Sequence, residues 1–391
     1  MNADRVPATL TLDDAAREPW DVLVVGAGPS GSVAAREAAL GGARTLLVDR
    51  SSFPRRKVCG CCLNGAAIRI LDGIGLGELP FHNKALPLTE FKLASHGRLA
   101  AVPLTEGVSL SRERFDAELI NAAVESGAEF LDGTQATVAE SAAGVREVAL
   151  KKAGRGVHSL ARVVIVSGGL GCRAFAERDA EERWASDASR VGGGAVLEVS
   201  SSDFAVGTIY MACHRNGYVG LVRLEDGRLD VAAALDGSAI KQHGGIGSLV
   251  EEILGTTGMN VPEGVAEAKW YGTAKLTQRR QHVYGDRFFV VGDAAGYIEP
   301  FTGEGIAWAL ATGTAVAPFA LASVEFGTEK TGPAWEKKKG ELLARRMRRC
   351  RTVSHLLRYP ALVSIVIRVL SRAPGLAKPI VKSLNTSFAI Q

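Results

Sequence analysis

The sequence predicts an α/β fold with a parallel sheet, a separate antiparallel sheet and a helical C-terminal segment. Three observations support this prediction. A glycine-rich turn, Gly26-x-Gly28-x-x-Gly31, lies between an apolar run at 21–26 and a small-residue helix at 29–40. A further buried strand follows late in the chain, at 287–292, and residues 191–235 before it have the short runs and turns of antiparallel strands.

The first βαβ unit predicts a Rossmann domain that binds a dinucleotide. Gly26 permits the tight turn, Gly28 lets the backbone approach a pyrophosphate, and Gly31 lets the helix pack on the strand. The helix N-terminus favours the pyrophosphate charge. Asp49 ends the second strand, at 43–49, where an acid accepts hydrogen bonds from a ribose diol. The alternative is a glycine turn without a ligand.

The next elements follow from hydrophobic periodicity and turn residues. We expect a loop and helix at 53–77, a helix at 112–126, a strand near 129–138 and a hairpin near 144–165. Two runs, 217–224 and 228–235, flank Glu225-Asp226-Gly227, which is a hairpin signal. A long helix opens near Gly303 or Gly305, and the chain is helical from Trp335 onward.

A second motif selects FAD among the dinucleotides. Gly292-Asp293-Ala294-Ala295-Gly296 ends the late strand, and Pro300 and Gly303-Glu304-Gly305 follow it. An acid at this strand end can bind the ribityl chain. The helix after Gly303 then points its positive end at the flavin N1–C2=O edge, where it stabilises the anion formed on reduction. The alternative is a structural Asp that caps a helix.

These motifs resemble the geranylgeranyl reductase family, which is related to flavin-dependent halogenases and p-hydroxybenzoate-hydroxylase-type monooxygenases. The resemblance rests on Phe53-Pro54-Arg55-Arg56-Lys57-Val58-Cys59-Gly60, on residues 292–306 and on Arg112-Glu113-Arg114-Phe115-Asp116. It runs from about Asp21 to Thr314 and is specific at the flavin-binding motifs.

The resemblance implies a glutathione-reductase-like Rossmann domain that holds one FAD, with NAD(P)H as a transient electron donor and no separate nicotinamide domain. Cys59 matches a cysteine implicated in catalysis in the reductases; the alternative is a small packing residue. The cofactor-binding residues that we expect are Gly26, Gly28, Gly31, Asp49, Arg50, Arg112, Ala136, Gly292, Asp293, Gly303, Glu304, Gly305 and Ile306. We expect no metal site, because no second cysteine or histidine cluster has ligand spacing.

Two departures from the family pattern fall where a substrate would be chosen. The family pattern has a glycine and a small or acidic residue where this chain has Cys61 and Cys62. These two cysteines are either a redox pair or ordinary packing residues. The reductase run Gly-Tyr-x-Trp-x-Phe-Pro matches here at Gly217 and Tyr218 only. Gly220 in place of the Trp opens volume over the flavin, and Tyr218 is either a hydrogen-bond donor in the site or an ordinary strand aromatic.

The resulting functional hypothesis is hydride transfer from reduced flavin to a C=C bond of an isoprenoid or other hydrophobic substrate, with Cys59 and Tyr218 as catalytic residues. The first alternative is a monooxygenase acting on an aromatic or polyketide-type compound. Its halogenase and hydroxylase motifs are missing, although Arg173 fits the latter. The second alternative is an electron relay without turnover.

The domain organisation follows from these assignments. We expect a flexible N-terminus at 1–19, a discontinuous FAD-binding domain at 20–185 and 283–330, a substrate-binding antiparallel sheet at 186–282 and a helical segment at 331–391.

Composition limits which binding partners and which cellular compartment we expect for the protein. A net charge of +4 over 391 residues does not favour nucleic acid, and no apolar run reaches the roughly 18 residues of a membrane span. The uneven spacing of six cysteines favours a reducing cytoplasm. Nine basic residues at 337–358 form either a solvated helix face or a peripheral contact with an anionic membrane. The sequence does not predict the oligomeric state.

Overall fold

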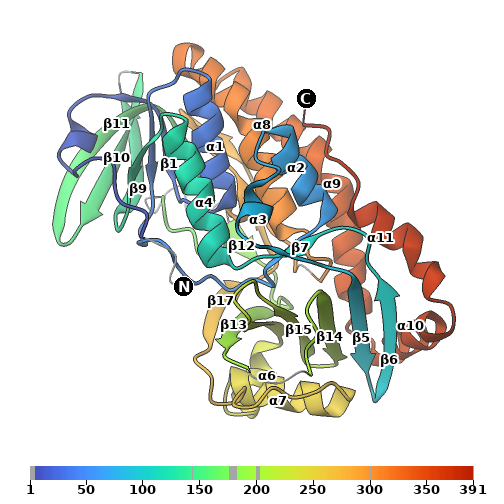
Figure 1. The fold of residues 1–391 in the computed structure, drawn as a ribbon. Coiled ribbons are helices and arrows are strands. Elements are labelled where there is room, and N and C mark those ends of the chain that lie inside the picture. Colours follow the sequence, from blue (N-terminus) through green and yellow to red (C-terminus); the bar gives the residue numbers. More distant parts are fainter. Residues whose placement is uncertain (1–4, 143, 176–182, 200–202, 300, 391) are drawn as a thin grey trace.

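The computed structural model describes residues 5–142, 144–175, 183–199, 203–299 and 301–390. It contains two large sheets, several helices packed against them and a C-terminal helical arm (Figure 1). Pro300 of the second flavin motif and residues 1–4 of the predicted N-terminus lie outside the described residues.

The first sheet is the predicted Rossmann sheet. Its parallel core runs in the order β20-β11-β1-β2-β8, and β19 pairs antiparallel at one edge. The strands are β1 (Trp20–Val25), β2 (Thr45–Val48), β8 (Glu129–Leu131), β11 (Arg155–Val166), β19 (Tyr284–Gly285) and β20 (Phe288–Val290), with β9 (Gln135–Ala142) and β10 (Val145–Lys152) as an antiparallel extension of β11. The strand predicted near 129–138 is therefore two strands, because the chain leaves β8 at Asp132 and re-enters at Gln135.

Three helices pack together beside this sheet: α1 (Pro29–Leu40), α4 (Arg112–Glu125) and α8 (Gly305–Phe326). Figure 1 shows α1 between the other two. Of the described helices, α8 alone is long and apolar enough by itself to cross a membrane, and 67% of its apolar window is buried inside the protein. Its composition therefore matches its place in the core.

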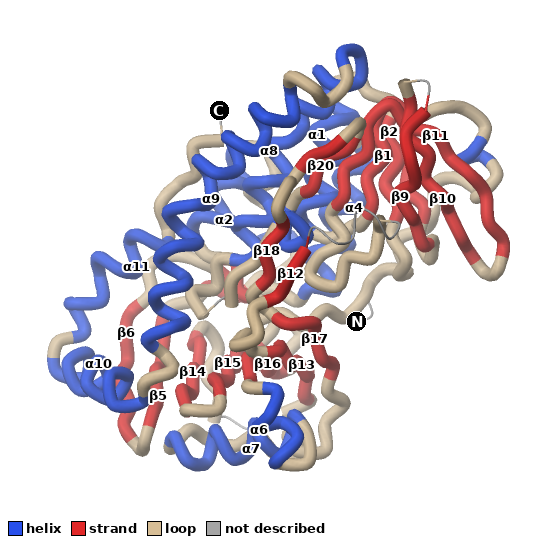
Figure 2. The backbone as a smooth tube through the Cα atoms, turned by 180° about the vertical axis from the view of Figure 1, so that it is seen from behind, coloured by secondary structure: helices blue, strands red, loops and turns tan. Residues whose placement is uncertain are grey.

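The second sheet has seven strands in the order β17-β13-β16-β15-β14-β5-β6. They are β5 (Glu90–Ser95), β6 (Arg98–Pro103), β13 (Val191–Leu197), β14 (Thr208–His214), β15 (Gly217–Arg223), β16 (Leu229–Leu235) and β17 (Tyr271–Lys275). Helices α6 (Gly237–Gln242) and α7 (Ile246–Thr257) cover one face (Figure 2). The other face is turned toward the Rossmann domain.

The structure changes two details of the predicted organisation. Strands β5 and β6 fall in the range 20–185 that we assigned to the FAD-binding domain, yet they extend the seven-stranded sheet, and β5 pairs parallel with β14. Residues 5–19, which we expected to be flexible, pack against the Rossmann domain. Val6 and Leu12 are buried, and the backbone N–H of Val6 donates to the Phe53 carbonyl.

Shorter elements connect the two sheets. They are η1 (Asp14–Ala16), β3 (Cys62–Leu63), α2 (Gly65–Gly73), α3 (Leu79–His82), β4 (Leu86–Pro87), β7 (Val108–Ser109), β12 (Arg183–Ala185), β18 (Gln278–Arg280) and η2 (Gly292–Ala295).

The C-terminal segment is helical, as predicted. It comprises α9 (Thr331–Leu356), α10 (Pro360–Arg372), η3 (Pro374–Ala377) and α11 (Lys378–Leu384). α9 packs on α8, and the chain bends by 105° before α10. Pro360 opens α10, as expected for the first turn of a helix, and α10 then packs on β5 and β6. The arm therefore reaches from the Rossmann domain across to the second sheet.

Candidate active site

One cavity of about 1590 Å³ runs between the two sheets and reaches the C-terminal arm. This volume exceeds the roughly 300–1,000 Å³ of an ordinary ligand pocket. It has a polar end, at the glycine motifs, and an apolar end, under α10 and α11. The cavity therefore has room for a large cofactor and a second molecule.

The glycine loop builds the first part of the polar end. Gly26 has a φ of +106°, which favours glycine. A Cβ on Gly31 would lie 1.8 Å from the Gly26 carbonyl oxygen, so Gly31 sets helix–strand packing and does not line the cavity. Asp49 fixes the loop by accepting hydrogen bonds from the backbone N–H groups of Ala27 and Ser51, each at 2.8 Å.

Two arginines face this loop. A Cβ on Gly28 would lie 3.8 Å from Nη2 of Arg55 and 4.0 Å from Nη2 of Arg112. Arg112 is held by Asp116 in a bidentate pair of 2.7 and 2.8 Å, and Arg55 shares the same carboxylate at 3.5 Å. Arg55 also lies 3.9 Å from the carboxylate of Asp49, so each guanidinium has a carboxylate partner and both lie beside a helix N-terminus. This arrangement fits a pyrophosphate.

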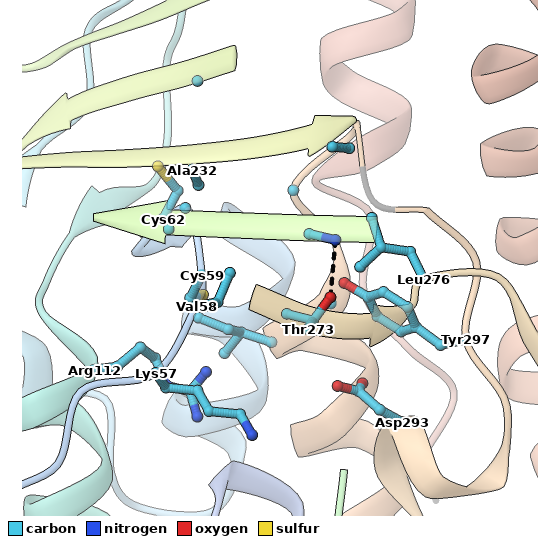
Figure 3. Close-up of a pocket in the computed structure, with 18 of the residues that line it drawn as sticks. Lys57, Val58, Cys59, Cys62, Arg112, Ala232, Thr273, Leu276, Asp293 and Tyr297 are labelled. Atoms are coloured by element: carbon cyan, nitrogen blue, oxygen red, sulfur yellow. Dashed lines mark hydrogen bonds between the residues drawn. The ribbon is translucent and has the colours of Figure 1, made fainter. Parts of the chain in front are cut away.

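The second motif lies against the first. Gly292 has a φ of +59°, and a Cβ there would lie 2.4 Å from Oγ of Ser30 in α1. Gly292 therefore packs the two motifs together and does not line the cavity, whereas Asp293 does. Figure 3 shows Asp293 across the cavity from Lys57. Burial raises the pKa of Asp293 to about 6, although Lys57 and Arg112 oppose the shift. Burial also lowers the pKa of Lys57.

The start of α8 forms the next part of the wall. Gly303, Gly305 and Ile306 line the cavity. The Glu304 side chain points away from it: Oε1 lies 2.9 Å from Nη1 of Arg346 in α9, and Oε2 accepts a hydrogen bond from Thr302. Glu304 therefore ties the cofactor helix to the C-terminal arm.

The loop at 59–62, which we call the cysteine loop, forms part of the cavity wall and carries Cys59, Cys61 and Cys62. All three thiols are free, and Cys59 and Cys62 line the wall. A hydrogen bond from the Cys61 thiol, assisted by the charge of Arg112, lowers the pKa of Cys59 well below its usual value. These contacts favour the thiolate form of Cys59, while burial raises the pKa of Cys62 and favours its thiol form.

The seven-stranded sheet supplies the opposite wall. Neighbouring strands present Gly194, Ala232 and Gly220 to the cavity in one cross-strand row. This row of small residues leaves the cavity deep at this place, and Gly220 takes the position of the Trp in the family pattern.

Polar groups lie on either side of this small-residue row. Tyr218 packs edge-on against Phe301, and its buried hydroxyl has no hydrogen-bond partner among the described residues. Asp230 is 4% exposed, and within the same residues its Oδ2 has no partner either. Burial, with the nearby Cys59 charge as a further cause, raises the pKa of Asp230 well above its usual value. Burial also raises the pKa of Tyr218, so burial favours the protonated form of both groups.

Most of the predicted site residues therefore meet at one cavity. Of those lining it, the predicted ones are Gly26, Gly28, Asp49, Arg50, Cys59, Arg112, Ala136, Tyr218, Asp293, Gly303, Gly305 and Ile306. Gly31, Gly292 and Glu304 lie behind the wall. Which residues contact the cofactor stays a prediction.

Sequence reasoning missed several cavity residues. Arg55 and Lys57 stand inside the Phe53–Gly60 motif, so their charge was available as a signal. Asp230 and Tyr297 gave no such signal, because their approach to the site depends on strand register and on the turn after η2.

Comparison with known proteins identifies the cofactor. Residues 19–170 match the FAD binding domain family. The chain is 28% identical over 404 residues to the menaquinone reductase of Mycobacterium tuberculosis, covering 93% of this chain and 92% of that one. It is also 28% identical over 331 residues to digeranylgeranylglycerophospholipid reductase 2 of Methanosphaera stadtmanae, covering 78% and 79%.

Solved structures show the same fold. The myxobacterial chondrochloren halogenase CndH has a TM-score of 0.74 at 17% identity, with 94% of this chain and 93% of that chain covered. The flavin-dependent brominase Bmp2 has a TM-score of 0.73 at 15% identity, with 94% of each chain covered. The predicted fold class and FAD are confirmed. The chain is therefore an FAD-dependent enzyme, and its resemblance to geranylgeranyl reductases is confirmed.

Proposed function

We propose that this enzyme reduces C=C bonds of an isoprenoid or other long hydrophobic substrate, with NAD(P)H as the electron donor. The observation that carries the proposal is the shape of the cavity. Beyond the polar end it continues as an apolar chamber lined by Phe91, Leu93, Ile209, Met211, Leu362, Val366 and Val381, among others. Such a chamber suits a long apolar chain better than a compact aromatic compound.

FAD supplies the hydride when it is bound and reduced. The chain's own residues then supply position and a proton. Arg55 and Arg112 would hold the pyrophosphate of FAD, and the residues at the start of α8 would stabilise its reduced ring. The substrate lies between the cysteine loop and the small-residue row of the sheet, so its reacting carbons are kept from bulk water.

The protonation states of the side chains that line the cavity indicate which of them can donate a proton to the substrate. Cys59, in the thiolate form, has no proton to give; its negative charge acts on the groups around it, including Asp230. Burial favours the protonated forms of Asp230 and Tyr218, which face the cavity, so either can donate the proton that completes saturation. The names of the two related reductases, which refer to menaquinone and to a digeranylgeranylglycerophospholipid, support an apolar substrate.

The experiment is an anaerobic turnover assay of the FAD-loaded enzyme. Reduction by NADPH or, as a control, by dithionite precedes addition of a geranylgeranyl lipid in detergent micelles. Mass spectrometry is expected to show products heavier by pairs of hydrogen atoms. Ala232→Trp fills the floor of the cavity at the small-residue row and should slow turnover of the lipid without changing flavin reduction by dithionite. No saturated product, together with oxygen-dependent hydroxylation of an aromatic compound, would overturn the proposal in favour of a monooxygenase.

A further inference from the structure

The C-terminal arm combines an unusual amount of exposed apolar surface with a one-sided charge. Eight of the 17 large apolar side chains that are exposed within the described residues lie between 356 and 380. They are Leu356, Tyr359, Leu362, Ile365, Val366, Val369, Leu376 and Ile380. We call this set the arm surface. A contiguous exposed apolar patch on a folded protein marks an interaction site.

The pattern on α10 is that of an interfacial helix. Leu362, Ile365, Val366 and Val369 follow the spacing of one helical face and are exposed, whereas Val363 and Ile367 are buried against the protein. α10 therefore presents apolar side chains both to the core and to solvent at the edge of the cavity. The 105° bend after α9 turns α10 away from the α9 axis, and Figure 1 shows α10 at the periphery of the molecule.

The charge of the same segment is strongly positive. Ten of the 46 basic residues and none of the 42 acidic residues lie in the last fifty positions, 342–391. The remainder of the chain therefore has a formal net charge of −6. Arg368 and Arg372 are exposed and lie next to the apolar stripe on α10, and Lys378 and Lys382 are exposed on α11. Cations beside an exposed apolar stripe complement an anionic bilayer, whereas a neutral protein groove would not use them.

The cavity reaches the arm surface from inside. Leu356, Leu362, Ile365, Val366 and Ile380 line the cavity and are also exposed to solvent. These side chains therefore form a mouth of the cavity, where the apolar chamber opens to solvent.

From these observations we infer that the arm surface docks on an anionic lipid bilayer and that a lipid substrate enters the apolar chamber between α10 and α11 directly from the membrane. The inference rests on the proposed function for the identity of the substrate. Docking itself rests on the exposed stripe and the charge, and it is tested without any turnover.

The test is sedimentation of the full-length, FAD-loaded protein with vesicles of phosphatidylcholine alone or with added phosphatidylglycerol. Binding is expected to be strong with the anionic lipid and to weaken as salt is raised. Arg368→Glu/Arg372→Glu should lower the partition coefficient at least tenfold, since each basic residue near such a surface contributes about 1 kcal/mol. Val369→Ser/Leu376→Ser should lower it for both kinds of vesicle.

Matched controls lie on the far side of the Rossmann sheet. Lys151→Glu and Leu160→Ser also change an exposed cation and an exposed apolar side chain, and they should leave vesicle binding unchanged. The portal is tested separately. The Val369→Ser/Leu376→Ser variant should lose turnover of a lipid embedded in vesicles but keep turnover of the same lipid in micelles.

The possible outcomes are distinguishable. Equal sedimentation of the wild type and both arm variants, or binding of the wild type to RNA but not to vesicles, would overturn docking. Docking with equal loss of vesicle and micelle turnover would overturn the portal. Absence of any saturated product, with docking intact, would overturn only the reductase proposal.

Discussion

The contact between Glu304 and Arg346 gives a sharp test of how the cofactor helix is anchored. Glu304 is 1% exposed at the start of α8, and its two oxygens are held by Arg346 and Thr302. Arg346 also donates to the carbonyl oxygen of Thr386 at 2.6 Å, and its guanidinium lies 3.9 Å from the centre of the Phe388 ring. Arg346→Met removes these contacts and leaves a buried carboxylate with one neutral donor.

Breaking a buried ion pair from one side costs about 3–5 kcal/mol, a large part of a stability of about 5–15 kcal/mol. We expect Arg346→Met to lower the free energy of unfolding of the apoprotein by that amount, measured by urea unfolding at 25 °C. The double variant with Glu304→Gln removes the stranded charge, so it should recover about 1–3 kcal/mol. Glu304→Gln alone should keep FAD affinity close to that of the wild type. A loss below about 1 kcal/mol for Arg346→Met would refute the reasoning, and so would a large loss of FAD affinity in Glu304→Gln.

Three further variants test other parts of the site. Gly31→Ala should lose FAD binding and about 1–3 kcal/mol of stability, because its Cβ would overlap the Gly26 carbonyl; retention of bound FAD by absorbance would contradict this. The pKa of Asp293 in the folded apoprotein, about 6, lies above the unfolded value of 3.8, so its carboxyl destabilises the fold as pH rises through this window. Asp293→Asn should therefore stabilise the apoprotein at neutral pH by up to about 3 kcal/mol and flatten its pH dependence in urea unfolding; an unchanged slope would count against it. Cys61→Ala removes the main cause of the lowered Cys59 pKa, so iodoacetamide should modify the Cys59 peptide more slowly at neutral pH, and an unshifted alkylation profile would oppose the assignment.

Local pattern was sufficient for the elements that carry the cofactor motifs. The strand, glycine turn and helix at 20–40 are visible because apolar periodicity and glycine spacing report backbone geometry directly. The residues at 5–19 were misread, because Val6 and Leu12 are isolated apolar residues whose burial depends on a partner elsewhere in the chain. Contacts of this kind produce no hydrophobic periodicity in the sequence.

The substrate wall was harder to predict for a different reason. Asp230 interrupts an apolar strand, and one residue of register would place it under α7 instead of in the cavity. The ion pair of Glu304 was not predicted, because its motif position suggests the flavin, while its side-chain direction is set by Arg346, 42 residues later. Positions in a motif predict the backbone path, whereas the partners of each side chain depend on the assembled fold.

The last prediction concerns Cys59, whose charge acts on more than the substrate. Because the Cys59 thiolate is one cause of the raised pKa of Asp230, Cys59→Ala lowers that pKa as well as removing the thiol. If Asp230 donates the proton, turnover needs its neutral form and falls as pH rises through its pKa. Cys59→Ala should therefore keep FAD, lower turnover at neutral pH and move the alkaline limb of kcat to lower pH. Asp230→Asn should abolish that limb. Full activity in Cys59→Ala would remove the thiolate from the mechanism, and an alkaline limb that persists in Asp230→Asn would assign the proton to Tyr218 instead.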